Sequence, residues 1–118
     1  MANETMQELI YAGIQTEEVL ERFAGNEALM LRILKKFPDD PNYQRLVQAM
    51  ESGNHEQALE AAHTLKGVSG NLAMTRLHQL AGEQVKMMRA GDWEAAKMLM
   101  ADLSEEYEKI KETIQRCL

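Results

Sequence analysis

The sequence is poor in the residues that build disulfide frameworks, thiolate metal sites and membrane spans. Cys117 is the only cysteine among 118 residues, which excludes an intrachain disulfide and a multi-cysteine zinc site. No apolar run approaches the roughly 20 residues that cross a bilayer. The N-terminus carries Asn3 and Glu4 where a signal peptide would be basic and then apolar. We therefore expect a cytoplasmic protein with no membrane partner.

An excess of positive charge is also missing. The formal net charge is -6 and the basic residues are scattered, so the sequence lacks the electrostatic signature of a nucleic-acid-binding protein. Hydrophobic residues make up 45% and charged residues 27%, a balance typical of a folded globular chain. The length fits one domain, and we expect residues 1–118 to form it.

Few prolines and no alternation of β-branched residues point to helix throughout the chain. The sequence has two prolines and is rich in Ala, Leu, Met, Glu, Gln and Lys, which favour helix. Start signals predict four substantial helices, following Pro41, Asn54, Thr75 and Asp92. Earlier starts lie at Asn3 or Thr5, at Thr16 and at Asn26. The connections between the substantial helices are short, so they predict antiparallel neighbours in an all-α protein.

The stretch from His63 to Gly70 is where the sequence indicates chemistry. It continues a helical pattern yet contains two glycines, each costing about 1 kcal/mol relative to alanine. His63, Lys66, Gly67 and Gly70 fall at helical spacings of three, four and seven, hence on one face, while Leu65 points the other way. The imidazole is expected to face outward, with open space beside it at both glycines.

These residues fit a carrier of phosphoryl groups. A neutral imidazole nitrogen is a competent nucleophile near pH 7, and the Lys66 ammonium would stabilise the charge of an attached phosphoryl group. The alternative is a surface histidine beside a solvated lysine, with the glycines marking a helix end. For a lone histidine that alternative would be preferred, but the combination favours the carrier.

The segment Ala62-His63-Thr64-Leu65-Lys66-Gly67-Val68-Ser69-Gly70-Asn71-Leu72 resembles the signature of the histidine-containing phosphotransfer (HPt) domain family. Residues 20–29 and 91–93 resemble further parts of that family, so the likeness covers nearly the whole chain. The resemblance implies an antiparallel four-helix bundle, here with a short additional N-terminal helical segment. It also implies that His63 is phosphorylated, that Lys66 is its charge partner and that Gly67 gives access.

Two positions depart from the family pattern. Ala73 stands where the family usually has glycine, and Val85 stands where a Gln or Glu often lies beside the histidine. Gln84, one position away, is a weak candidate for that role. On the histidine face, we expect Leu59 and Glu60, together with Gly67 and Gly70, to contact a docked partner.

The sequence therefore predicts a phosphorelay intermediate. In this hypothesis His63 accepts a phosphoryl group from an aspartyl phosphate on a response-regulator receiver domain and passes it to another receiver. The partners would be receiver domains and a sensor histidine kinase, with magnesium on the receiver and no cofactor in this chain. Nothing resembles a nucleotide site, so an autonomous ATP-dependent enzyme is not expected. A monomer is the default expectation.

Two other functions remain open at this point. One is a phosphoacceptor domain of the chemotaxis-kinase type, which takes phosphate from an ATP-bound kinase domain. The other is a non-catalytic helical adaptor that binds a receiver or kinase with His63 chemically idle. A metal site built from His55, His63 and His78 is not expected, because no Cys or carboxylate spacing completes a ligand set.

Overall fold

The protein is all-helical, as the sequence predicts. A computed structural model describes residues 2–118, and within that range the chain forms seven α-helices and one 3₁₀ turn. They are α1 (Ala2–Tyr11), α2 (Thr16–Arg22), α3 (Glu27–Lys36), η1 (Phe37–Asp39), α4 (Asn42–Ser52), α5 (His55–Asn71), α6 (Thr75–Arg89) and α7 (Trp93–Cys117). Over the same residues, no helix combines the length and apolar character that crossing a bilayer requires.

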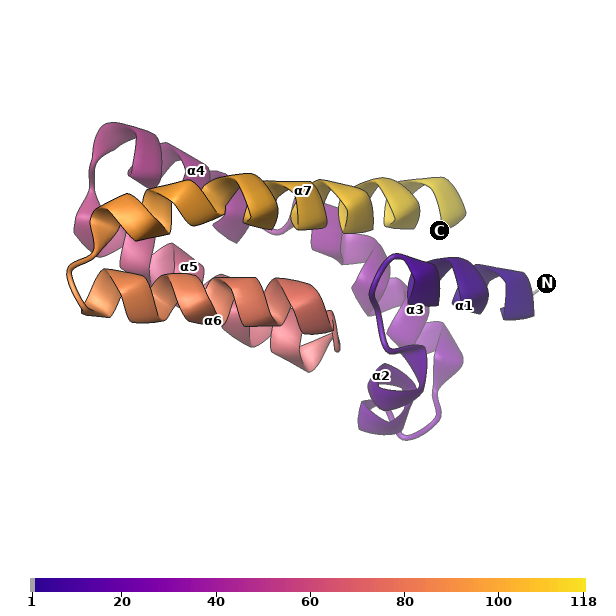
Figure 1. Ribbon diagram of the computed structural model, residues 1–118. Helices are drawn as coiled ribbons and strands as arrows, with labels where there is room; N and C mark the ends of the chain where they lie inside the picture. The colour runs from indigo at the N-terminus through magenta and orange to yellow at the C-terminus, as the bar shows by residue number, and fades with distance from the viewer. Residues whose placement is uncertain (1) are drawn as a thin grey trace.

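Helices α4 to α7 make up the larger part of the molecule (Figure 1). Helices α5 and α6 lie side by side and run in opposite directions, since Gly70 lies against His78 and Lys66 lies against Gly82. The inward side of α5 is narrow, because Ala58, Ala61 and Ala62 are all buried. Small residues at these positions let neighbouring helices approach α5 closely.

An aromatic cluster joins α4 and α7. Tyr43 of α4 stacks on Tyr107 of α7, with ring centroids 3.8 Å apart, and Phe37 packs against the same Tyr107 ring at 5.4 Å. Burial raises the pKa of Tyr107 to about 12, because the ionised phenolate would lose its hydration. The cluster thus packs α4 and η1 against α7.

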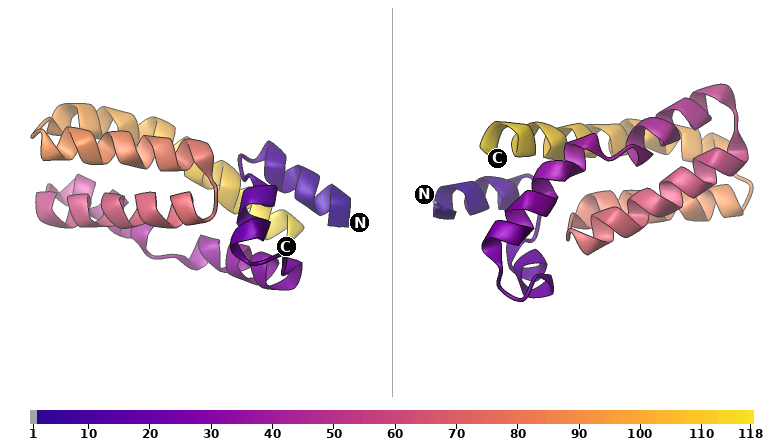
Figure 2. Two further views of the ribbon diagram at one scale, coloured as in Figure 1. Left: turned by 90° about the horizontal axis from the view of Figure 1, so that it is seen from below. Right: turned by 180° about the vertical axis from the view of Figure 1, so that it is seen from behind.

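The N-terminal part is larger than the short additional segment that the sequence analysis expected. Helices α1, α2 and α3 contain 10, 7 and 10 residues. The physical reason is the length of α7, whose 25 residues extend beyond the ends of its neighbours (Figure 2). Helix α1 covers part of this extension, where Glu8 accepts a hydrogen bond from Arg116 at 3.3 Å. An amphipathic helix needs such cover along its apolar stripe.

The turn between α5 and α6 joins the two parts of the molecule. The Ile14 and Met74 backbones form an isolated antiparallel bridge, and the Gln15 N–H donates to the Ala73 carbonyl at 3.0 Å. From α2, one guanidinium nitrogen of Arg22 donates to the Gly70 and Asn71 carbonyls at 2.6 and 2.7 Å. These carbonyls lie in the last turn of α5, where the regular helical bonds end, and the Gly70 carbonyl also accepts from the Ala73 N–H at 3.2 Å; Arg22 therefore adds a cap to α5.

From α2 onward the predicted helix starts agree with the structure to within one residue, whereas α1 already includes Ala2 and so begins before the predicted starts at Asn3 or Thr5. Asn26, Asn54 and Asp92 each accept a hydrogen bond from the backbone N–H three residues later, as expected of capping residues. Thr75 and Thr16 are instead the first residues inside their helices, and Pro41 precedes α4 rather than beginning it. Helix boundaries are commonly uncertain by this amount.

Candidate functional site

The candidate site lies on the outward face of α5. The side chain of His63 is exposed, whereas Ala62 and Leu65 on either side of it are buried. The helical period produces this contrast, because neighbouring residues point to different faces. Asn54 fixes the start of the helix by accepting a hydrogen bond from the Gln57 N–H at 3.2 Å. The outward position of the imidazole, expected from spacing, is confirmed.

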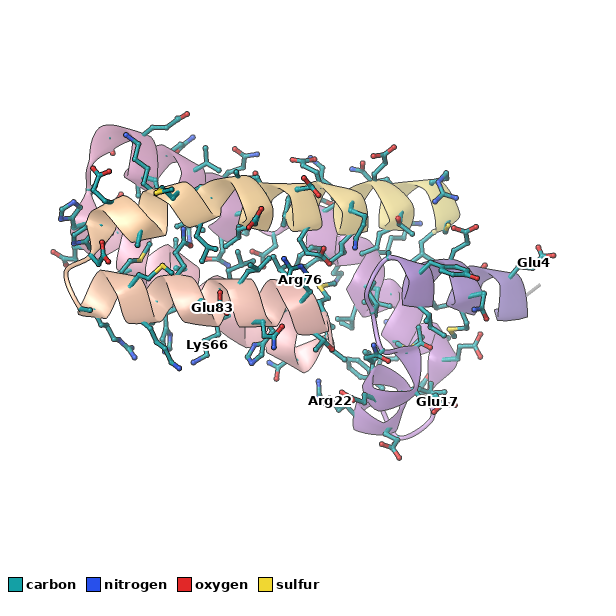
Figure 3. All side chains as sticks on the ribbon, viewed as in Figure 1. Glu4, Glu17, Arg22, Lys66, Arg76 and Glu83 are labelled. Carbon is teal, nitrogen blue, oxygen red and sulfur yellow. The ribbon has the colours of Figure 1, made fainter. Side chains whose placement is uncertain are left out.

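Lys66 lies one turn after His63 and is partly buried, because its side chain crosses onto α6. A Cβ built at Gly82 would lie 3.7 and 3.9 Å from the Cε and Cδ atoms of Lys66. Figure 3 shows the Lys66 side chain emerging at the lower edge of α6. None of the three ion pairs found within residues 2–118 includes Lys66. Sequence reasoning missed Gly82, whose only signal was an interior glycine in a predicted helix.

The two glycines of the motif have different surroundings. A Cβ built at Gly67 would have nothing within 4 Å, so the space beside this residue is open, as expected. A Cβ built at Gly70 would lie 2.8 Å from Nδ1 of His78. The expectation that Gly70 also leaves open space is therefore wrong, because an imidazole from α6 occupies it. Gly70 serves close packing between helices rather than access.

Gln84 does not lie where a partner for His63 is needed. Its side chain is completely buried, and its Nε2 donates to the Ala96 carbonyl and to the Met100 sulfur, both at 3.0 Å. Its Oε1 has no hydrogen-bond partner among the described residues. The suggestion that Gln84 orients the exposed imidazole is thus corrected, since its amide is directed to α7. Val85 is buried as well.

The two further residues predicted to contact a partner lie on α5 before His63. Leu59 is partly buried and packs against the core, so it is less exposed than the sequence analysis expected. Glu60 is exposed and lines a hollow of about 380 Å³ between α4 and α5, together with Arg45 and Asn42. Both residues therefore border the outward face of α5.

The other two histidines have separate structural roles. His55 stacks on Trp93 with ring centroids 3.8 Å apart, so the starts of α5 and α7 lie together. His78 bonds the Lys66 carbonyl through Nδ1 at 2.8 Å. Among the described residues, no group of three His, Cys, Asp or Glu side chains is placed to hold a metal ion. The outward face of α5 thus presents the exposed imidazole of His63, with Lys66 one turn away.

Comparison with known proteins identifies the family. The model of the Hpt domain family matches residues 40–113, which is more than half of the chain and includes all of α4, α5 and α6. Neither the curated proteins nor the solved structures gave a match. The matched region contains His63, Lys66 and Gly67, whereas α1, α2 and α3 lie outside it.

Proposed function

Because this chain belongs to the Hpt domain family, whose members transfer phosphoryl groups through histidine in phosphorelays, we propose that His63 is its phosphoacceptor. The observation that carries the proposal is the exposed imidazole beside the open space at Gly67. A receiver domain could bring its phosphorylated carboxyl against this face without displacing a side chain at residue 67. The role of Gly67 is therefore access.

The proposed reaction is a reversible transfer between an aspartyl phosphate and His63. The unprotonated imidazole nitrogen attacks phosphorus, an N–P bond forms, and the P–O bond to the receiver carboxyl breaks as the carboxylate leaves. The Lys66 ammonium stabilises the negative charge on the transferred group. The receiver supplies the acidic site and its magnesium, so this chain needs no cofactor of its own.

The whole chain is proposed to act as one HPt-like domain, with α4 to α7 as its antiparallel four-helix bundle. One connected core supports this, because it includes Leu9 and Ile14 from the N-terminal part and Ile114 from α7. We further propose a monomer that works in the cytoplasm with receiver domains and a sensor histidine kinase. Leu59 and Glu60, which border the histidine face, would contact the docked receiver.

The test is phosphoryl transfer in solution. The purified chain is incubated with a phosphorylated receiver domain and magnesium, and its intact mass and the acid lability of the product are measured. We expect one acid-labile phosphoryl group on the wild type and none on His63→Gln. His55→Gln is the matched control, because it removes a second exposed histidine and should leave uptake intact.

Any of three results would contradict the proposal. Uptake that persists in His63→Gln would assign the phosphate to another residue. No uptake by the folded wild type from several competent receivers, combined with binding that survives His63→Ala, would favour a non-catalytic adaptor. Uptake from an ATP-bound kinase domain but from no receiver would indicate the chemotaxis-type phosphoacceptor instead.

A further inference from the structure

His78 is a partly buried histidine of α6 that the proposed reaction does not use. Its imidazole occupies the gap at Gly70, where a Cβ would meet Nδ1 at 2.8 Å and Cε1 at 3.0 Å. The same Nδ1 lies 2.8 Å from the Lys66 carbonyl oxygen. A carbonyl only accepts hydrogen bonds, so Nδ1 must carry the proton and donate it. The His78 side chain therefore joins α6 to α5 at Lys66, the residue that carries the ammonium group.

Lys66 is held by α6 at two points that lie one helical turn apart. His78 bonds its backbone carbonyl, and Gly82, four residues later, lies under its side-chain carbons at 3.7 to 3.9 Å. Residues four apart on a helix share one face, so both contacts come from the same side of α6. The missing side chain at Gly70 permits the first contact, and the missing side chain at Gly82 permits the second.

We propose that His78 is a positioning residue for phosphoryl transfer, acting through Lys66. Its hydrogen bond fixes the position of the Lys66 backbone, on α5, relative to α6. The Lys66 side chain then extends across Gly82 of α6 in one conformation. Without that bond the lysine is free to adopt other rotamers, and its ammonium spends less time where the transferred group needs it. This inference rests on the proposed function of His63 and Lys66.

The first experiment compares two variants of nearly equal shape. His78→Asn keeps an N–H donor close to the position of Nδ1, whereas His78→Leu has the same branching and no donor. We expect transfer from a phosphorylated receiver to slow by roughly three- to tenfold in His78→Leu, the loss associated with one hydrogen bond. His78→Asn should restore most of that rate. Equal rates for wild type and His78→Leu, at equal folded fraction, would overturn the proposal.

A double substitution tests whether Gly70 acts through the same imidazole. Gly70→Ala must displace His78, so we expect it to slow transfer about as much as His78→Ala does. Once the imidazole is gone the added methyl has room, and Gly70→Ala should have no further effect in the His78→Ala background. Fully additive losses would contradict the proposal. Gln79→Leu is the control, because it changes an exposed neighbour on α6.

A measurement without phosphate separates this inference from the proposed function. Nuclear Overhauser effects between the Lys66 Hε and Gly82 Hα protons report the course of the lysine side chain directly. We expect them in wild type and in His78→Asn, and we expect them to weaken at least twofold in His78→Leu. Unchanged intensities in His78→Leu would overturn the positioning role even if His63 is phosphorylated. A wild type that shows them but takes up no phosphate would overturn the proposed function, while the placement of Lys66 by His78 would still hold.

Discussion

Two consecutive parts of α5 use glycine for opposite purposes. Around His63 and Gly67 the helix surface is open, and a Cβ at Gly67 would touch nothing within 4 Å. Around Gly70 the helix is held by His78 from α6 and by Arg22 from α2. A partner needs the first part to be accessible, and accurate placement of its side chains needs the second part to be fixed. The same residue type therefore does not imply the same role.

The difference between the two parts is tested most directly by adding one methyl group at Gly70 and, separately, at Gly67. Gly70→Ala should lower the free energy of unfolding by about 1 to 3 kcal/mol, because the methyl overlaps the His78 ring. Chemical denaturation with an unchanged slope against denaturant would measure it. A Gly70→Ala protein as stable as the wild type would mean that His78 is not confined as the structure has it.

Removing Arg22, the α2 residue that caps α5, should have a smaller effect on stability. Arg22→Gln loses two hydrogen bonds to the carbonyls at the end of α5, and because Arg22 is exposed we expect a loss of about 1 kcal/mol. Amide hydrogen exchange should accelerate at Ala73 and Met74, whose N–H groups bond to the end of α5. Glu21→Gln, an exposed neighbour, should change neither quantity; faster exchange there too would point to general loosening of α2.

The open part should respond to a methyl group in the opposite direction. Gly67→Ala should raise the free energy of unfolding by about 0.5 to 1 kcal/mol, since the helix gains propensity and nothing obstructs the methyl. Under the proposed function, a larger side chain such as Gly67→Leu should keep the fold and slow transfer from a receiver. Thermal unfolding and transfer rates measured together check this, and a destabilised Gly67→Ala would show that residue 67 is not open.

The smallest change in stability is expected from a substitution in the turn that follows α5. Ala73 has a φ of +50°, a left-handed conformation that is costly for alanine and suits the glycine usual in the resembling family. Ala73→Gly removes this strain but also a buried methyl group, so we expect a gain below about 1 kcal/mol. Ala24, exposed with a φ of +54°, is the matched comparison, and Ala24→Gly should gain more. The reverse order would show that the buried methyl contributes little.

Much of this molecule could be read from local sequence. The capping residues Asn54 and Asp92 and the apolar period of α5 predicted where helices begin and that His63 points outward, because these are properties of a single helix. The family motif within residues 40–113 is also local. The substitution of Ala73 for glycine was visible as well, although its left-handed backbone was not.

Other features depended on which helices meet. From the sequence, Gly70 looked like Gly67, and Gln84 looked like a neighbour of His63. The structure fills the space at Gly70 with His78 and buries Gln84 against Ala96 of α7. Nothing in the sequence indicated that His78 and Gly82 contact Lys66, because these contacts join residues 12 and 16 positions apart on two different helices. Hydrophobic periodicity and capping residues determined the position of each helix and the outward direction of His63. Only packing between helices decided which glycine has open space beside it, because this depends on the side chain that a neighbouring helix places there.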